Sequence, residues 1–242
     1  MKSSDVTWDD YDAVLFDLDG VLTPTADVHM RAWERLFRDY LASAHPEVPG
    51  YTTQDYFAHI DGKPRYDGVR SMLASRGIEL AEGTPEDDPS QDTVSGLGNR
   101  KNAVFAQILH DEGVQPYAGS VRLLDALAAR GTKVAVVSSS RNAPAVLEAA
   151  GLADRFEVVV DGSVAARESL QGKPSPETFL YAADQLEVPK ERAVVVEDAL
   201  SGVAAGRAGD FGLVVGVDRG AGEQALLGQG ADVVVRDLEE LV

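Results

Sequence analysis

The sequence predicts an α/β fold in which a doubly wound parallel sheet is interrupted, after its first strand, by a helical insert. Three observations lead to this prediction. The apolar run Ala13–Phe16 has the length and character of a buried strand. Residues 26–113 then show helical spacing of apolar side chains and no strong strand. After Pro116, strands and helices alternate, as they do in parallel sheets.

The first strand is expected over 12–16, and it leads directly into Asp17 and Asp19 of the sequence DLDGV. Because side chains two apart on an extended chain share one face, these carboxylates should project together at the carboxyl end of the strand. Open parallel sheets place their ligands at that edge. Two carboxylates this close repel each other unless a proton or a cation intervenes. The pair therefore indicates a metal ion, an acid/base role, or both.

The insert is predicted to be a small helical domain. Helices are expected over 29–37, 67–76 and 101–112, and the acidic, turn-rich stretch 83–95 is expected to be a loop. We place the core at 1–24 and 114–242 and the insert at 25–113. Because the insert joins the core beside Asp17 and Asp19, we expect it to act as a cap over them. Hinges are expected at Pro24 and at 113–119.

The second half of the chain supplies the rest of the sheet and the helices that cross over it. The elements expected there are helices over 121–129, 145–150, 176–186 and 201–208, and strands over 133–137, 156–160, 193–196, 213–217 and 232–235.

Polar residues follow three of these strands. Ser138, Ser139, Ser140, Arg141 and Asn142 come after the strand at 133–137, where hydroxyl and backbone N–H groups can bind phosphate oxygens. Serine and asparagine are equally favoured as helix N-caps, so capping is the alternative.

Two further groups follow later strands. Lys173 is followed by Pro174 and can pair with a carboxylate or a phosphate, or can simply lie on the surface before a helix. Glu197 and Asp198 can cap a helix, or can join Asp17 and Asp19 as oxygen ligands of a Mg²⁺-like ion. Taken together, the strand ends fit phosphoryl transfer to a carboxylate, because an Asp can act as nucleophile while cations neutralise the transferring group.

These motifs, in this order, resemble the haloacid dehalogenase superfamily of phosphotransferases, whose core is Rossmann-like and carries an α-helical cap. The resemblance implies a role for each matched residue. Asp17 would be the nucleophile and Asp19 the general acid/base. The phosphoryl group would be bound by Ser138, Ser139, Asn142 and Lys173, and Mg²⁺ by Asp17, Asp19, Glu197 and Asp198.

Within the superfamily, the chain is most similar to the β-phosphoglucomutase subgroup. The similarity includes HMRAW at 29–33, RKN at 100–102 and SSSRN at 138–142. It implies that the substrate and cap contacts are made by His29, Trp33, Arg65, Lys101, Ser140 and Arg141. Pro24 and Ala199 depart from the subgroup pattern, which commonly has Asp and Ser there. The alternative for the cap cations is an ordinary exposed helix surface, and for Trp33 it is packing.

The expected activity is Mg²⁺-dependent conversion of β-glucose 1-phosphate to glucose 6-phosphate through an aspartyl-phosphate. A phosphatase acting on sugar phosphates or other small molecules is the main alternative, because it shares the first half-reaction. A non-catalytic module that binds phosphometabolites is the remote one. Haloacid dehalogenation is disfavoured, because it would leave the metal ligands without a purpose.

Composition and charge exclude several classes of function. The 242-residue chain has a formal net charge of −18 and no cysteine. Cysteine nucleophiles, thiolate metal sites and disulfides are therefore excluded, and nucleic acid and anionic membranes are disfavoured as partners. The first ten residues are polar, and no apolar stretch approaches the roughly 20 residues that span a bilayer. We expect a cytoplasmic monomer whose partner is a small phosphorylated sugar.

Overall fold

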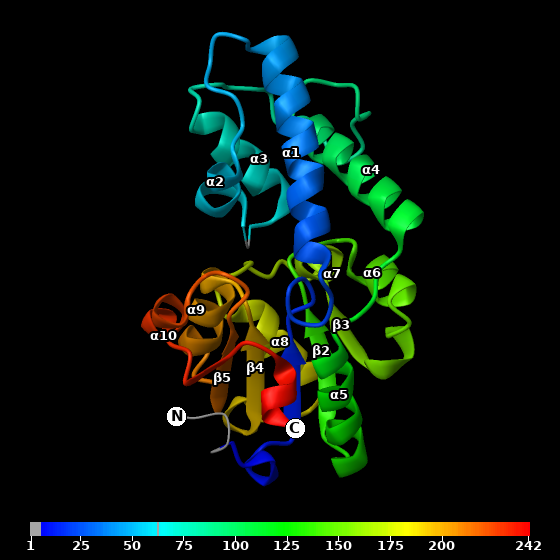
Figure 1. Ribbon diagram of the computed structural model, residues 1–242, viewed down its shortest axis with the longest axis vertical. Coiled ribbons are helices and arrows are strands. Elements are labelled where there is room, and N and C mark those ends of the chain that lie inside the picture. The colour runs from blue at the N-terminus through cyan, green and yellow to red at the C-terminus, as the bar shows by residue number, and fades with distance from the viewer. Residues whose placement is uncertain (1–5, 62) are drawn as a thin grey trace. The chain divides into compact units, whose positions relative to one another are not determined.

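The computed structural model describes residues 6–61 and 63–242, and the chain divides into two compact units (Figure 1). The first unit, the core, comprises Met1–Thr25 and Val114–Val242. The second unit, the cap, comprises Ala26–Gly113.

The core is built on one parallel sheet of six strands in the order β3-β2-β1-β4-β5-β6. The strands are β1 Ala13–Phe16, β2 Lys133–Val137, β3 Val158–Val160, β4 Ala193–Glu197, β5 Leu213–Val217 and β6 Val233–Val235. Phe16, the last residue of β1, is in register with Val136 of β2 and Val196 of β4. The residues that follow β1, β2 and β4 are thereby brought to one edge of the sheet.

The central strands are apolar because helices cover both faces of the sheet. Every residue of β1, β4 and β5 is buried, as expected of parallel strands that are covered on both faces. The core helices are α5 Ala118–Arg130, α6 Ala143–Ala149, α7 Gly162–Arg167, α8 Glu177–Gln185, α9 Leu200–Ala208 and α10 Glu223–Gln229. Helix α8 packs on β1, β2 and β3, whereas α9 packs on β4 and β5 and α10 on β5 and β6 (Figure 1).

The predicted fold class is confirmed, and most predicted core elements are present within a few residues. Helices α7 and α10 were not predicted. Helix α7 is only 6 residues long and depends on Asp161, whose carboxylate accepts hydrogen bonds from Ser163 N and Val164 N. Short helices that rely on a cap carry little periodic signal. The strand predicted from 156 begins only at Val158.

All regular secondary structure among the described residues of the cap is helical. It contains α1 Thr25–Ala44, which begins at the last residue of the core, then α2 Thr53–Asp55, a π-helical turn Tyr56–Ile60, α3 Arg65–Ala74 and α4 Val94–Glu112. Trp33, Phe37, Met72 and Leu97 are among the buried side chains of its own hydrophobic core. The cap therefore has a core separate from that of the sheet.

Helix α4 begins earlier than predicted. Its first residue is Val94, within the stretch expected to be a loop, and Thr93 caps it by accepting a hydrogen bond from Gly96 N. Gly96 and Gly98 lower the helix propensity of the first turns, which explains the late predicted start.

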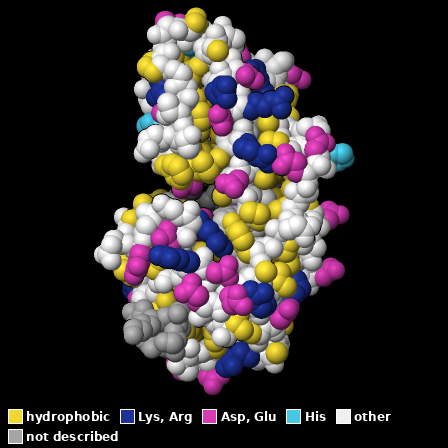
Figure 2. Space-filling model, viewed as in Figure 1, with side chains coloured by type: hydrophobic (Ala, Val, Ile, Leu, Met, Phe, Trp, Pro, Cys, Tyr) yellow, Lys and Arg dark blue, Asp and Glu magenta, His cyan; other side chains and the backbone are white. Residues whose placement is uncertain are grey.

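None of the helices in the described parts of the chain is both long and apolar enough to cross a membrane. On the face shown in Figure 2, acidic and basic side chains lie interspersed on each unit.

Candidate active site

The centre of the candidate site is a buried ion-pair cluster at the carboxyl edge of the sheet. Lys173 Nζ lies 2.5 Å from Asp17 Oδ1 and 2.5 Å from Glu197 Oε1. It also donates a hydrogen bond to Val137 O, at 3.0 Å. Asp17, Lys173 and Glu197 are 8%, 6% and 1% exposed. One cation from the segment after β3 thus connects the ends of β1, β2 and β4.

Burial and charge act strongly on this cluster. Burial raises the pKa of the Asp17 carboxyl well above its usual value, and the nearby carboxylates of Glu197 and Asp19 add to the effect while Lys173 opposes it. Burial by itself would lower the pKa of Lys173, but the two carboxylates outweigh burial and raise it. Lys173 therefore stays charged, and a further cation at the cluster would favour the ionised form of Asp17.

A third carboxylate lies beside this pair. Asp17, Glu197 and Asp198 each offer an oxygen, and these oxygens all lie within 4.8 Å of one another. A cluster of hard oxygen donors at this spacing fits a magnesium-like ion.

Glycines leave the space that these carboxylates occupy. Gly20 has a φ of 88° and no side chain, and a Cβ there would overlap the carboxylate of Asp198. A Cβ on Gly202 of α9 would overlap the carboxylate of Glu197, which also accepts a hydrogen bond from Ala199 N. The two carboxylates therefore depend on glycines that lie far apart in the sequence.

Asp19 is held by a hydroxyl that the sequence interpretation missed. Thr25 Oγ1 donates a hydrogen bond to Asp19 Oδ1, and it lies 2.7 Å from Thr23 Oγ1. Both threonine side chains are completely buried. The only signal in the sequence is that Thr23 and Thr25 flank Pro24, which gives no indication that both hydroxyls turn inward.

The serine loop after β2 is folded by its own hydroxyls. Ser138 Oγ accepts a hydrogen bond from Ser140 N, and Ser140 Oγ accepts one from Asn142 N, both at 3.1 Å. Ser138 is buried, Ser139, Ser140 and Asn142 are partly buried, and Arg141 is exposed. Asn142 directly precedes α6. Asn142 makes no side-chain capping hydrogen bond to that helix. The predicted binding of phosphate by this loop stays a prediction.

The predicted cap residues fall into two groups. Lys101, which is 2% exposed, contacts His29 Nδ1 and lies 5.1 Å above the ring of Trp33. Trp33 is itself buried and stacks on Phe37, so its role in this structure is packing.

Arg65 forms the second group. It starts α3 and donates a hydrogen bond to Asn102 Oδ1 at 2.9 Å. The cap thus brings His29, Trp33 and Lys101 together, whereas Arg65 lies among other partners. The core brings together Asp17, Lys173, Glu197 and Asp198.

This arrangement suits chemistry on an anionic group. A buried lysine, together with a cation that the carboxylate cluster could hold, can neutralise a phosphoryl group, while a carboxylate at the same edge can attack it. Asp19 is a second carboxylate, held by a hydroxyl, that can exchange a proton with a reacting oxygen.

Comparisons with known proteins agree with this chemistry. The family profile of haloacid dehalogenase-like hydrolases matches residues 11–210. Over 239 residues the chain is 52% identical to a Mycobacterium tuberculosis protein named β-phosphoglucomutase, and the match covers 95% of this chain and 91% of that one. It is 28% identical over 233 residues to a Thermotoga maritima protein named phosphorylated carbohydrates phosphatase, which covers 95% and 96% of the two chains.

Among solved structures, the chain matches the β-phosphoglucomutase of Clostridium difficile with a TM-score of 0.76 and 25% identity, covering 96% of this chain and 93% of that one. The resemblance predicted from the motifs is therefore confirmed. The protein is an enzyme of the phosphomutase and phosphatase class, and it belongs to the haloacid dehalogenase-like hydrolase family.

Proposed function

We propose that the protein is a β-phosphoglucomutase that converts β-glucose 1-phosphate to glucose 6-phosphate through a phosphorylated Asp17. The observation that supports the chemistry is the contact of Lys173 with both Asp17 and Glu197. The 52% identity to the mycobacterial relative supports the choice of substrate.

In this proposal Asp17 is the nucleophile. Its carboxylate attacks the phosphorus of a sugar bisphosphate, and the bond from phosphorus to the sugar oxygen breaks. Asp19 gives a proton to that oxygen as it leaves. In the reverse half, Asp19 takes the proton from a hydroxyl of β-glucose 1-phosphate while that hydroxyl attacks the phosphorylated Asp17. Lys173 balances charge on the phosphoryl oxygens, and the serine loop supplies hydroxyl and N–H donors.

Asp17, Glu197 and Asp198 would hold a Mg²⁺ ion, with the backbone carbonyl of Asp19 as a further ligand. When bound, the ion supplies positive charge that keeps Asp17 ionised and stabilises the transferring group. The formal charge of Asp17, Glu197, Asp198 and Lys173 supports this assignment, because three carboxylates and one ammonium leave two negative charges for a divalent ion to neutralise.

The cap would bind the rest of the bisphosphate. Arg65 offers a planar guanidinium that can bind the second, non-transferring phosphate bidentately. Lys101 and His29 are proposed to contact the sugar. Binding at the cap would also exclude water, which would otherwise hydrolyse the phosphorylated Asp17.

A phosphatase is the second candidate, and the relative named phosphorylated carbohydrates phosphatase favours keeping it. In that case water in place of a sugar hydroxyl resolves the phosphorylated Asp17. The core residues would act in the same way in both reactions, so only the acceptor differs.

The deciding experiment supplies β-glucose 1-phosphate, Mg²⁺ and a trace of glucose 1,6-bisphosphate, and measures glucose 6-phosphate and free phosphate in parallel. The proposal expects glucose 6-phosphate in large excess over phosphate. Release of phosphate without glucose 6-phosphate would establish the phosphatase. The Asp17→Asn variant is the matched control, because an amide of the same shape cannot accept the phosphoryl group. If Asp17→Asn kept the wild-type rate, the nucleophile would have been assigned wrongly.

A further inference from the structure

The guanidinium of Arg65 is oriented by two amide side chains from one helix. It donates to Asn102 Oδ1 at 2.9 Å and to Asn99 Oδ1 at 3.5 Å, and both residues belong to α4. These acceptors are neutral amide oxygens, so the two bonds fix the direction of the guanidinium and leave its positive charge intact.

Asn99 is itself fixed through both ends of its amide. Its Oδ1 also accepts a hydrogen bond from the hydroxyl of Tyr66, at 3.1 Å. Its Nδ2 donates to Pro85 O at 3.0 Å and to Asp87 O at 2.9 Å. Two backbone acceptors on the nitrogen side determine which way the amide faces, and therefore place Oδ1 toward Arg65.

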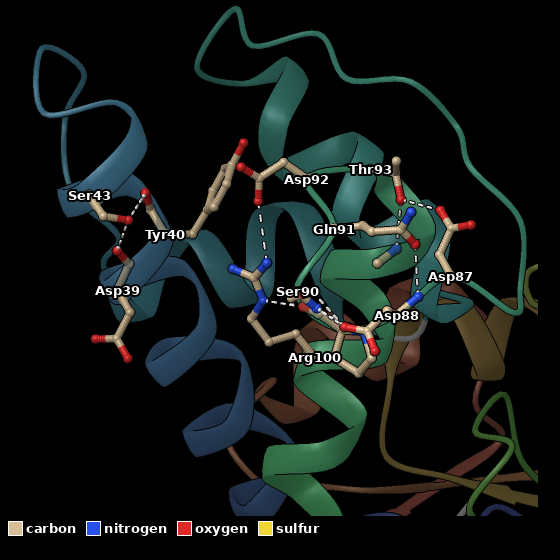
Figure 3. A network of polar contacts seen from close by, with 12 residues as sticks. Asp39, Tyr40, Ser43, Asp87, Asp88, Ser90, Gln91, Asp92, Thr93 and Arg100 are labelled. Carbon is tan, nitrogen blue, oxygen red and sulfur yellow. Dashed lines mark hydrogen bonds and ion pairs between the residues drawn. The ribbon is translucent and has the colours of Figure 1, made fainter.

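The loop that carries the carbonyls of Pro85 and Asp87 is held by several hydrogen bonds (Figure 3). Asp87 Oδ2 accepts a hydrogen bond at 2.6 Å from Thr93 Oγ1, the side chain that caps α4. Arg100 Nε donates to Pro89 O at 2.6 Å. The loop is thus tied to the start of the helix on which Asn99 lies, so the positions of the loop carbonyls are set by α4.

Figure 3 also shows a turn within this loop. Asp88 Oδ1 accepts hydrogen bonds from Ser90 N and Ser90 Oγ, at 2.8 and 2.6 Å, and Asp88 N donates to Gln91 Oε1 at 2.8 Å. These side chains hold the turn together without contacting Asn99 through any of those bonds. They therefore offer a control in the same loop.

The absence of a side chain at Gly98 is a second, independent observation that links this part of α4 to Arg65. A Cβ on Gly98 would lie 2.7 Å from Tyr66 Cδ1 and 3.2 Å from Arg65 Cδ. Glycine inside a helix is otherwise unfavourable, since every other residue except proline forms helix more readily. The missing side chain lets Arg65 and Tyr66 lie directly against α4 beside Asn99.

We propose that Asn99 is a positioning residue that aims the Arg65 guanidinium at the second phosphate of a sugar bisphosphate, and thereby sets the preference of the enzyme for bisphosphates. The inference rests on the proposed function, which gives Arg65 that phosphate. Asn99 acts through Arg65 and is not required for transfer of the first phosphate to Asp17. Substrates that lack a second phosphate should therefore be insensitive to it.

The test compares two substrates in the intact, Mg²⁺-loaded enzyme. Glucose 1,6-bisphosphate has a second phosphate, and p-nitrophenyl phosphate has none. Asn99→Ala should raise the KM for the bisphosphate by about tenfold, as expected for the loss of a bond that orients a charged group. The kcat/KM for p-nitrophenyl phosphate should stay within about twofold of wild type.

Two further variants serve as a positive comparison and as a control. Arg65→Ala should show the same selective rise in KM, of equal or larger size, because it removes the guanidinium itself. Ser90→Ala, which removes a hydrogen bond in the same loop, should leave both substrates unchanged. A rise with Arg65→Ala but not with Asn99→Ala overturns the inference and leaves the proposed function standing. If Arg65→Ala leaves the KM for the bisphosphate unchanged, Arg65 does not bind the second phosphate. That part of the proposed function and the inference about Asn99 would then both be wrong.

Gly98→Ala covers the possibility that Asn99→Ala weakens the fold. Alanine favours the helix, so this variant keeps α4 intact while its Cβ displaces Tyr66 and Arg65. The same selective rise in KM is expected. If either variant slowed both substrates equally, the effect would be structural and Asn99 would have no positioning role.

Discussion

The guanidinium of Arg219 stacks on the ring of Tyr117, with its Cζ 3.9 Å from the ring centroid. The same side chain donates hydrogen bonds from Nε to Gly20 O at 2.8 Å and from Nη1 to Arg236 O at 3.0 Å. Gly20 lies in the turn that carries Asp19, and Tyr117 precedes α5. Arg219 therefore connects the turn that carries Asp19 to the segment through which the chain re-enters the core.

Replacing Arg219 by Gln should slow turnover about tenfold and lower the free energy of unfolding by about 2 kcal/mol, because one cation–π contact and two hydrogen bonds are lost. Arg236→Gln is the control, since it removes a nearby positive charge and keeps the carbonyl that Arg219 contacts. Steady-state rates and thermal unfolding would measure both effects. Equal turnover rates in the two variants would show that Arg219 is not needed to position the turn that carries Asp19.

Thr25→Val should reduce kcat about tenfold, because it removes the hydroxyl that donates to Asp19 while keeping the shape of the side chain. Thr25→Ser keeps the donor and should retain most of the wild-type rate. Pre-steady-state measurement of phosphoryl transfer, with the bisphosphate as donor, gives the size of the effect. A normal rate in the valine variant would mean that Asp19 is held adequately by other groups.

Lys173→Ala should abolish measurable turnover and destabilise the core by about 3–5 kcal/mol, because it leaves Asp17 and Glu197 as uncompensated buried charges. Added Mg²⁺ should recover more stability in this variant than in wild type, since the ion replaces the missing positive charge. Lys190→Ala, which breaks a surface pair with the exposed Asp210, should cost less than about 1 kcal/mol. Thermal unfolding with and without Mg²⁺ makes the comparison.

Gly202→Ala and Gly228→Ala form a matched pair of glycine substitutions in helices. Each alanine favours its helix by up to about 1 kcal/mol. The Cβ on residue 202 would overlap the Glu197 carboxylate, whereas no atom lies within 4 Å of the Cβ position on residue 228. Gly202→Ala should therefore weaken Mg²⁺ binding about tenfold or more, and Gly228→Ala should leave it unchanged. Calorimetric titration with Mg²⁺ measures both, and equal affinities would contradict the assignment of Glu197 to the metal.

Asp55 gives the cap a stability that depends on pH. Burial by itself would raise the pKa of Asp55, but the hydrogen bonds from Arg76 and Thr52 outweigh burial and lower it. Because the folded pKa is the lower one, the stabilisation is fully present above the unfolded value of about 3.9 and is lost as the pH falls through the folded value. Asp55→Asn should reduce the melting temperature of the protein by several degrees at pH 7.

The difference between wild type and Asp55→Asn should stay constant from neutral pH down to about pH 5 and narrow below about pH 4. Scanning calorimetry across that range follows it. A difference that grew on acidification would have the wrong sign for a carboxylate stabilised by Arg76.

The sequence was sufficient to predict the sheet because apolar runs and the polar residues that follow them are local features. Asp17, Lys173 and Glu197 each follow such a run or its loop, and parallel pairing necessarily brings strand ends to one edge. The roles of these residues remain predictions, but their proximity is a direct result of the fold.

What the sequence did not reveal depends on side chains that meet only after folding. Thr25, Arg219 and Asn99 are polar residues of ordinary type, and nothing local distinguishes them from capping or surface residues. Gly98 gave a misleading signal, since its low helix propensity delayed the predicted start of α4. Only the folded structure shows why a glycine is needed there, because Tyr66 and Arg65 pack against the place where a Cβ would lie.

The central place of β1 in the sheet has a consequence for synthesis of the chain. Strand β1 is made first, but its two neighbours begin only at Lys133 and Ala193. The cap, a compact unit over Ala26–Gly113, can fold in the meantime. Until β2 and β4 leave the ribosome, β1 has both edges and its apolar side chains open to other chains. We therefore expect aggregation during expression to begin at this strand, and chaperone binding to protect it during that interval.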